Sequence, residues 1–285
     1  MTQAGVAIVG AGRMGQGLAL ALQSGGRSVL LLSRTRHPVA SPLRLHEGSR
    51  ASATGEADVV VLAVPDGAVT AVAGELAGEA AIESRHVVLH LSGLLDRGAL
   101  IPLAATGAGL GSFHPLQTVP DPLGAPGRLR GAYAGIEGDA RALAAGQELA
   151  EALGMRAVTI PARAKPAYHA GATFAANYTT VLAAVAERLA ATAGVPPEVA
   201  GRLYLPLVRG AASSLELGPA AALTGPVRRG DAETVAAHLR ALAPEDRALY
   251  LLLAREALRL AREAGLPRDA ADRVARVLDQ TAADG

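Results

Sequence analysis

The chain has 285 residues, of which half are hydrophobic and 19% are charged, and its formal net charge is +1. These values are typical of a globular protein with room for two modest domains, and a nearly neutral chain has no global attraction to nucleic acid, membranes or acidic partners. The absence of cysteine excludes disulfides, thiolate metal sites and cysteine nucleophiles. We also predict no metal site. Because Met1–Gly5 lacks the basic region of a signal peptide, we expect a cytoplasmic protein.

Short apolar runs alternate with helix-like segments over the first half of the chain. Nearly continuous apolar strands that alternate with helices are typical of a parallel sheet covered by helices on both faces. The sequence therefore predicts an α/β fold that begins with a doubly wound, mostly parallel sheet. The expected strands are Val6–Val9, Val29–Leu32, Asp58–Val64, His86–Leu91, Ala132–Ile136 and Arg156–Ile160, and the expected helices include Met14–Gln23, Val69–Leu76 and Ala140–Leu153.

From Lys165 onward the chain consists of long Ala/Leu-rich stretches separated by Gly-Pro and similar pairs, at which helices usually end. We therefore predict a Rossmann-type dinucleotide-binding domain at residues 1–161 and an all-helical substrate and dimerisation domain at residues 162–285. Pro166–Ala186 has no charged residue and is long enough to span a bilayer, but its His, Asn and Thr residues favour a buried helix of a soluble protein.

The stretch "GAGRMG" matches the G-x-G-x-x-G pattern of dinucleotide-binding proteins. It follows the first expected strand and begins the first expected helix, which is the context that the pattern requires. Glycines there allow a tight turn, a close approach of the backbone to a pyrophosphate and close packing of helix on sheet, while the helix N-terminus offers free N–H groups. The expected pyrophosphate-binding residues are Gly10, Ala11, Gly12, Arg13, Met14 and Gly15.

The end of the second expected strand indicates which dinucleotide binds. NAD-binding proteins carry a carboxylate there for the ribose 2′-hydroxyl, whereas this chain has Ser33, Arg34 and Arg36. A hydroxyl with guanidinium groups suits a 2′-phosphate, so NADP is favoured over NAD. Val64 and Pro65 follow the third strand at the same sheet edge and are expected to border the cofactor, with Asp66 shaping the loop.

Three polar stretches are candidates for a substrate site. Ser92 ends the fourth strand, and His114 lies in an expected loop, Ser112–Thr118. Lys165, His169, Thr173 and Asn177 follow each other at intervals of four residues, so they form a stripe along one face of a helix. Such a stripe needs water, a ligand or an internal hydrogen-bond network. The functional interpretation is a polar wall beside the nicotinamide that positions a carbonyl or imine and passes a proton.

Several of these motifs together resemble a known family. The chain is similar to Rossmann-like oxidoreductases with a C-terminal domain of unknown function, DUF2520, over nearly its whole length and in the same order. The wider group includes pyrroline-5-carboxylate reductases, β-hydroxyacid dehydrogenases, ketopantoate reductases and coenzyme F420-linked NADP oxidoreductases. The resemblance implies a C-terminal helical domain like that of 6-phosphogluconate dehydrogenase, and a homodimer formed by its helices. The matching stretches are "GAGRMG", "LAVPD", "HLSG", "GSFHPLQT", "AKPAYHAGATFAANY" and "LTGPVRRGD".

The chain departs from two catalytic patterns of that group. β-Hydroxyacid dehydrogenases use a lysine and an asparagine four residues apart, whereas here Lys165 is followed at that spacing by His169, and Asn177 comes eight residues later. The His114-Pro115 pair is similar to a step in prephenate dehydrogenases, but Leu116 follows where those proteins usually have a methionine. The family therefore implies the chemistry and leaves the substrate open.

The first hypothesis is an NADP-dependent oxidoreductase that transfers a hydride to or from a small polar carbonyl, imine or hydroxy acid. The proton donor would be Lys165 or His169, with Ser92, His114 and Asn177 also at the site. The alternatives are a non-catalytic NADP(H) sensor or scaffold and, less favoured, an enzyme like prephenate dehydrogenase or an F420-linked oxidoreductase. F420 or a flavin as second redox partner stays open.

Overall fold

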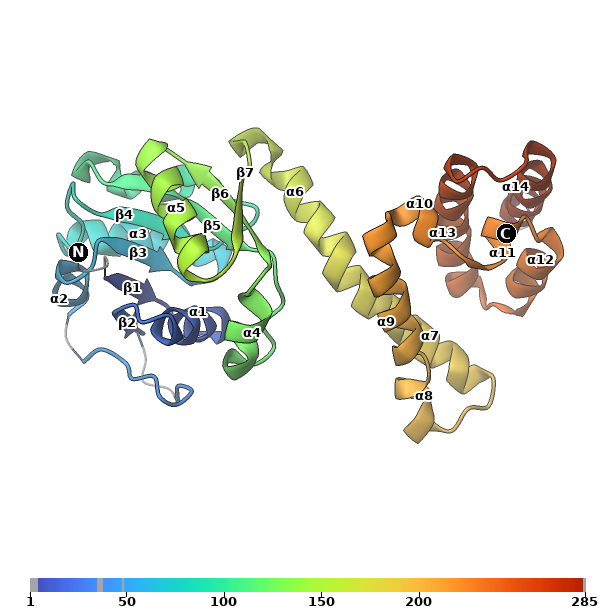
Figure 1. The fold of residues 1–285 in the computed structure, drawn as a ribbon, viewed down its shortest axis with the longest axis horizontal. Helices are drawn as coiled ribbons and strands as arrows, with labels where there is room; N and C mark the ends of the chain where they lie inside the picture. The colour runs from blue at the N-terminus through green and yellow to red at the C-terminus, as the bar shows by residue number, and fades with distance from the viewer. Residues whose placement is uncertain (1–4, 35–37, 48, 284–285) are drawn as a thin grey trace. The chain divides into compact units, whose positions relative to one another are not determined.

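The computed structural model describes residues 5–34, 38–47 and 49–283. The chain forms two compact units, Met1–Asn177 and Tyr178–Gly285, which are described separately (Figure 1). In the first unit the described strands form one seven-stranded sheet in the order β2-β1-β3-β4-β5-β6-β7. Neighbouring strands are parallel except β5 and β6, which are antiparallel. The α/β, mostly parallel Rossmann-type fold is therefore confirmed.

The strands of the first unit are short, and several helices connect them. The strands are β1 Val6–Val9, β2 Val29–Leu32, β3 Val59–Leu62, β4 Val87–His90, β5 Gly109–Pro115, β6 Tyr133–Gly138 and β7 Arg156–Thr159. The α-helices are α1 Arg13–Ser24, α2 Arg50–Gly55, α3 Val69–Gly78, α4 Ala125–Leu129, α5 Ala140–Ala152 and α6 Lys165–Ala172. The other helical segments are η1 Asp66–Ala68, η2 Arg97–Thr106, η3 Pro122–Gly124, η4 Ala162–Ala164 and the π-helical η5 Thr173–Tyr178.

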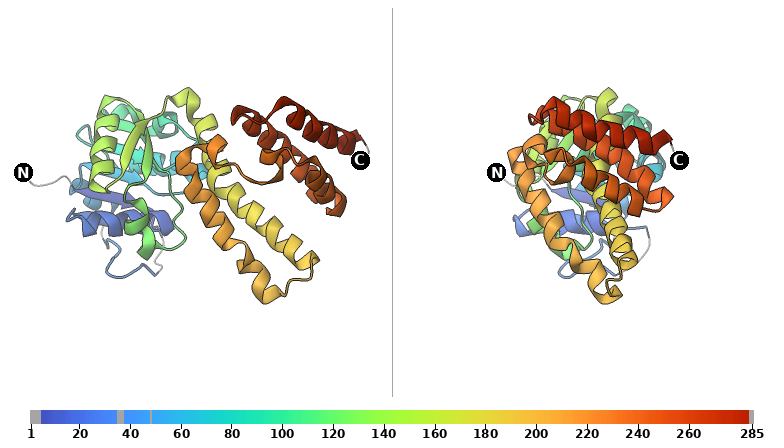
Figure 2. Two further views of the ribbon diagram at one scale, coloured as in Figure 1. Left: turned by 45° about the vertical axis from the view of Figure 1, so that its right-hand side comes forward. Right: turned by 90° about the vertical axis from the view of Figure 1, so that its right-hand side faces the viewer.

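The sheet is buried on both faces, which explains the nearly continuous apolar runs. Side chains alternate along a strand, so Ile8 packs with α1 and α5 on one face while Ala7 packs with α3 and η2 on the other. The views agree that helices lie on both sides of the strands (Figures 1 and 2). Parallel strands that are covered in this way have their carboxyl ends at one edge of the sheet, where ligands of such folds bind.

The predicted loop Ser112–Thr118 is wrong in its first part, because Gly109–Pro115 forms β5, an interior strand of the sheet. The glycines Gly109 and Gly111 made this strand look like a loop in the sequence. A Cβ at Gly111 would lie 2.7 Å from the Ala142 Cβ of α5, so the strand needs glycine for close packing. His114 therefore stands on a strand, paired with Gly135 of β6.

Helix α6 belongs to the first compact unit, although the sequence pattern groups it with the C-terminal domain. Lys165, its first residue, is buried against β4 and β5 through hydrogen bonds to Ser92 and Ser112. The compact units thus divide after Asn177, within the π-helical segment, and the domain boundary after residue 161 stays a prediction.

The described elements of the second unit are all helical. A hydrophobic cluster from α11 to α14, with Val235, Leu258 and Val274 at its centre, forms its core. Arg188 of α7 pairs with the buried carboxylate of Asp246 on α13. No helix in the described ranges combines the length and apolar character needed to cross a membrane. The helices are α7 Thr179–Thr192, α8 Pro197–Leu203, α9 Leu205–Ser214, η6 Leu215–Leu217, α10 Pro219–Ala222, α11 Gly225–Arg229, α12 Ala232–Ala241, α13 Pro244–Glu263 and α14 Arg268–Ala283.

Pro166–Ala186, expected as a buried helix, is largely exposed in this chain. It comprises most of α6, the π-helical segment and the first half of α7. Val181 and Leu182 of α7 are among the exposed large apolar side chains. The prediction of burial is therefore wrong for the single chain, because α7 presents its uncharged side chains to the surface.

Candidate cofactor and active site

The glycine turn after β1 has the geometry that a dinucleotide requires. Gly10 has φ +117°, in the region that favours glycine, and a Cβ there would lie 2.8 Å from the Ala63 carbonyl carbon. A Cβ at Gly15 would collide with the Gly10 carbonyl, so α1 packs closely on the turn. Apart from its neighbours along the chain, no described residue lies within 4 Å of the Cβ position of Gly12, so the backbone is open to a ligand at the N-terminus of α1.

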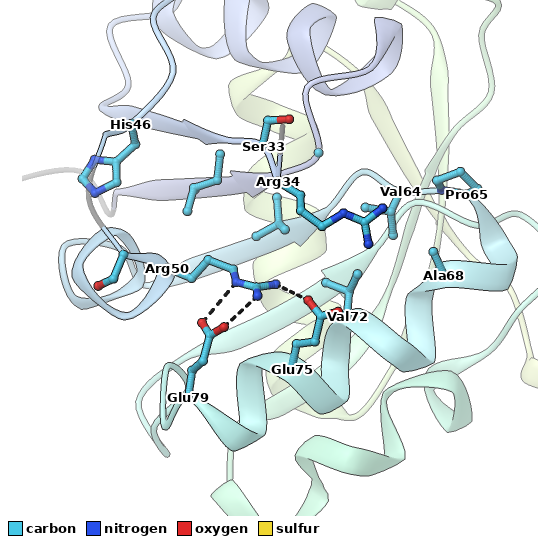
Figure 3. A pocket seen from close by; sticks show the side chains of 14 residues that line it. Ser33, Arg34, His46, Arg50, Val64, Pro65, Ala68, Val72, Glu75 and Glu79 are labelled. Atoms are coloured by element: carbon cyan, nitrogen blue, oxygen red, sulfur yellow. Dashed lines mark hydrogen bonds and ion pairs between the residues drawn. The ribbon is translucent and has the colours of Figure 1, made fainter. Parts of the chain in front are cut away.

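A cavity of about 570 Å³ opens beside this turn (Figure 3). Five of the residues predicted to bind the cofactor line it, and the Arg34 side chain extends across it toward Val64. The other predicted residues lie around the turn: Ala11 is buried, Arg13 is exposed, and Met14 packs against the core. Arg36 lies outside the described residues. The predicted residues that line the cavity are Gly10, Ser33, Arg34, Val64 and Pro65.

The sequence analysis missed the far wall of the cavity. Arg50, the first residue of α2, donates hydrogen bonds to Glu75 at 2.5 Å and to both oxygens of Glu79 at 2.7 and 3.1 Å (Figure 3). The hydrogen bond from Arg50 lowers the pKa of Glu75. This pairing partly neutralises two carboxylates that would otherwise repel a phosphate. No local motif marks these residues, because α2 and α3 meet only through the fold.

A second polar cluster lies at the same sheet edge, after β4. Ser92 donates a 2.7 Å hydrogen bond from Oγ to Asp66, and its Oγ accepts bonds from two backbone amides of its own loop. Asp66 follows Pro65, which lines the cavity, so this bond joins the cofactor loop to the Ser92 loop. The expectation that Asp66 shapes its loop fits this contact, and the hydroxyl of Ser92 is occupied by loop contacts.

Lys165 is the most deeply buried charged residue of the cluster. Its Nζ donates to Ser112 Oγ at 2.7 Å and to the Ser92 carbonyl at 3.2 Å, and only 1% of the residue is exposed. Glu137 of β6 lies on the other side of Ser112 and accepts from the Arg97 amide at 2.9 Å. Burial lowers the pKa of Lys165 and raises that of Glu137, and each charge opposes the other's shift.

The rings of His114 and His169 meet edge to face in the same cluster. Their ring centroids are 5.6 Å apart, and His114 Nδ1 lies 2.9 Å from the Tyr168 hydroxyl. Gly93 leaves room for both rings, because a Cβ there would lie 2.9 Å from His114 Nε2 and would collide with His169 Nδ1. His169 Nδ1 is buried without a hydrogen-bond partner in the described part of the chain.

The structure therefore brings together four of the five predicted catalytic residues, Ser92, His114, Lys165 and His169. The fifth, Asn177, is exposed. Thr173 bonds back to the His169 carbonyl. The stripe is regular only through α6, since the chain turns π-helical from Thr173 and loses the α-helical spacing.

Burial makes His114 a source of pH dependence. Desolvation lowers its pKa from 6.5 to about 4. The nearby His169 and Lys165 lower the pKa further, whereas the negative charge of Asp66 raises it. The unfolded chain therefore binds a proton between these values that the folded chain does not. We expect His114 to make its full contribution to the free energy of unfolding above about pH 6.5. This contribution should fall by about 2 kcal/mol between about pH 7 and pH 5.

Urea unfolding at the two pH values measures this effect. The variant His114→Asn should show a smaller loss of stability over that interval than the wild type, because asparagine does not titrate. Equal losses in the two proteins would contradict the assignment.

Comparisons with known proteins agree with this geometry. Residues 5–91 match the family described as coenzyme F420-dependent NADP oxidoreductase, and residues 132–257 match DUF2520, a domain of unknown function. The two matches follow each other along the chain, the first over the strands β1 to β4 and the second from the start of β6 to within α13. This confirms the family inferred from the motifs and the preference for NADP, which the open turn at Gly12 and the Ser33 and Arg34 side chains of the cavity fit. A search of curated proteins gives no match.

Solved structures share the fold over nearly the whole chain. A Bacteroides fragilis protein named as a candidate NADP oxidoreductase is 24% identical, with a TM-score of 0.70, and the match covers 89% of this chain and 97% of that one. Protein TM1727 of Thermotoga maritima is 23% identical, with a TM-score of 0.67 and 90% and 98% coverage. Pyrroline carboxylate reductase of Plasmodium falciparum, solved with NADP bound, is 12% identical, with a TM-score of 0.61 and 99% and 98% coverage.

Proposed function

We propose that the chain is an NADP-dependent oxidoreductase that transfers a hydride between NADP(H) and a small polar carbonyl, imine or hydroxy acid. The observation that carries the proposal is the link between the two halves of the site. Pro65 lines the cofactor cavity, and the carboxylate of the next residue, Asp66, accepts a hydrogen bond from Ser92. Ser92 is followed by Gly93, which lies against the imidazole rings of His114 and His169. The polar cluster thus lies next to the cofactor loop at the ligand-binding edge of the sheet.

In this proposal the glycine turn and the N-terminus of α1 hold the pyrophosphate, and Ser33 and Arg34 hold the 2′-phosphate. Bound NADPH supplies the hydride, and the protein supplies orientation and a proton. His169 is better placed than Lys165 to give that proton. Its Nδ1 has no partner in the described chain, whereas the Lys165 ammonium donates to Ser92 and Ser112. Lys165 then acts as the buried positive charge that stabilises negative charge developing above it.

The test is direct detection of hydride transfer. NADPH carrying deuterium at C4 is incubated with the protein and with panels of aldehydes, keto acids and cyclic imines, and the products are analysed by mass spectrometry. We expect deuterium in one class of product and loss of NADPH absorbance at the same rate. A non-catalytic sensor or scaffold, the competing hypothesis, would bind NADPH and transfer no label to any compound.

We further propose that the protein is a homodimer that pairs through the helices of the second unit. Exposed apolar side chains are concentrated on α7, α9 and η6, including Leu207, which is 70% exposed, and Leu217, which is 74% exposed. So many exposed large apolar side chains on neighbouring stretches of the sequence favour an interaction surface. The uncharged start of α7 would become buried against a second copy, which accounts for its composition.

Replacement of Leu207 by glutamate is expected to shift the protein from dimer to monomer, because it places a charge in an apolar interface. Sedimentation velocity measures the change. Ile101→Glu is the matched control, since Ile101 of η2 is 66% exposed in the first unit and should leave the dimer intact. A monomeric wild type, or equal behaviour of the two variants, would contradict the proposal.

A further inference from the structure

Tyr168 has no role in the hydride transfer proposed above, yet it is fitted closely against the site. Its hydroxyl lies 2.9 Å from His114 Nδ1, and the two rings meet edge to face with centroids 5.6 Å apart. Burial raises the pKa of Tyr168 to about 12, so the phenol keeps its proton at neutral pH. The contact is therefore a hydrogen bond between a neutral phenol and an imidazole.

Gly135 leaves the space that the Tyr168 hydroxyl occupies beside His114. It pairs with His114 across β5 and β6, and a Cβ there would collide with the Tyr168 hydroxyl and lie 2.7 Å from Cζ. A phenol O–H is a better hydrogen-bond donor than a neutral imidazole N–H, and an imidazole nitrogen is a better acceptor than a phenol oxygen. The Tyr168 hydroxyl therefore donates to His114 Nδ1.

His114 is neutral as well, because burial lowers its pKa to about 4. A neutral imidazole carries one N–H, so if Nδ1 accepts from Tyr168 the hydrogen is on Nε2. Nε2 lies on the side of Gly93 and His169, and the described part of the chain gives it no hydrogen-bond partner. A directed donor thus faces the space beside the second imidazole.

We propose that Tyr168 is a positioning residue that holds His114 in the Nε2–H tautomer, so that this N–H donates a hydrogen bond to an acceptor oxygen of the substrate. This inference rests on the proposed function and narrows it. A fixed N–H donor fits the oxygen of an aldehyde, ketone or keto acid and the oxyanion that forms on it. It opposes a protonated imine, whose nitrogen is itself a donor. The substrate class is therefore a carbonyl compound or the corresponding hydroxy acid.

The chain contains its own control for this arrangement. His238 of α12 and Tyr250 of α13 form a second pair with nearly the same geometry, 3.0 Å between Nδ1 and the hydroxyl and 5.8 Å between edge-to-face rings. That pair lies in the second unit and its hydrogen bond is exposed. Tyr250→Phe therefore removes the same kind of bond from a pair that belongs to the other compact unit.

The experiment is nuclear magnetic resonance of the full chain labelled with ¹⁵N at histidine, with His114→Asn used to assign the signals. In the wild type we expect His114 to show an unprotonated Nδ1 and a protonated Nε2 from neutral pH down to about pH 5. Tyr168→Phe should give a mixture of the two neutral tautomers. Tyr250→Phe should leave the His114 signals unchanged. A protonated Nδ1 in the wild type, or an unchanged tautomer in Tyr168→Phe, overturns the proposal.

Turnover provides the second readout. With a carbonyl substrate, Tyr168→Phe should lower kcat by about 10- to 100-fold and leave the Kd for NADPH unchanged, while Tyr250→Phe keeps wild-type values. Deuterium transfer to imines in preference to carbonyls would overturn the substrate class. The tautomer is measured without substrate, so a chain that transfers no hydride refutes the proposed function while the spectra still decide the role of Tyr168.

Discussion

Replacement of Lys165 by alanine is expected to lower turnover by about 10²- to 10⁴-fold and to leave NADPH affinity nearly unchanged. Lys165 does not line the cofactor cavity, and its ammonium is the one positive charge that is buried beneath the histidine pair in the described first unit. Loss of this charge also removes a hydrogen bond to Ser112 and the positive charge that favours the ionised form of Glu137. We therefore expect the free energy of unfolding to fall by about 3 kcal/mol. Single-turnover oxidation of NADPH and urea unfolding measure the two effects.

A double variant separates the catalytic effect from the structural one. In Lys165→Met with Glu137→Gln, the charges on both sides of Ser112 are removed, so much of the lost stability should return. Turnover should stay low, because the positive charge is still absent. Recovery of turnover together with stability would show that Lys165 only supports the fold, and unchanged turnover in Lys165→Ala would remove it from the catalytic site. His169→Ala should lose turnover to a similar degree without the loss of stability.

Replacement of Arg34 by alanine is expected to weaken NADPH binding by about 10- to 100-fold and to leave NADH binding nearly unchanged. Arg34 extends across the cavity at the end of β2, where a 2′-phosphate would accept charge-assisted hydrogen bonds from its guanidinium (Figure 3). Fluorescence titration of the purified protein with NADPH and NADH measures both affinities.

Arg276→Ala is the matched control, because Arg276 is an exposed arginine of α14 in the second unit. It should bind both cofactors as the wild type does. If Arg34→Ala weakens both cofactors equally, Arg34 does not recognise the 2′-phosphate. If neither NADPH nor NADH binds the wild type, the interpretation of the glycine turn fails.

The apolar strands could be predicted from the sequence because burial on both faces leaves a continuous run, as in Val59–Leu62 of β3. β5 could not, because two of its residues are glycines that the packing of α5 and β6 requires, and glycine-rich sequence usually indicates a loop. Spacing along a helix likewise predicted a stripe from Lys165 to Asn177. It could not show that the α-helix ends at Ala172.

Individual residues of the candidate site could be predicted where a titratable side chain stands out in the sequence, as His114 and Lys165 do. The supporting residues were not, because their roles arise from contacts distant in sequence. Glu137 joins the cluster from β6 through Ser112, and Tyr168 lies 54 residues from the histidine it contacts. Arg50 reaches the cofactor cavity from a helix that has no recognisable motif.

Gly93 and Gly135 are the spaces into which the aromatic rings fit: one admits the two imidazoles, and the other admits the phenol of Tyr168. A side chain at either position would displace a ring, so we expect these glycines and rings to vary together. Among related chains, glycine at both positions should occur together with His114, Tyr168 and His169, and loss of a ring should release the facing glycine to vary. That covariation gives a means of recognising, from sequence alone, which DUF2520 proteins share this site.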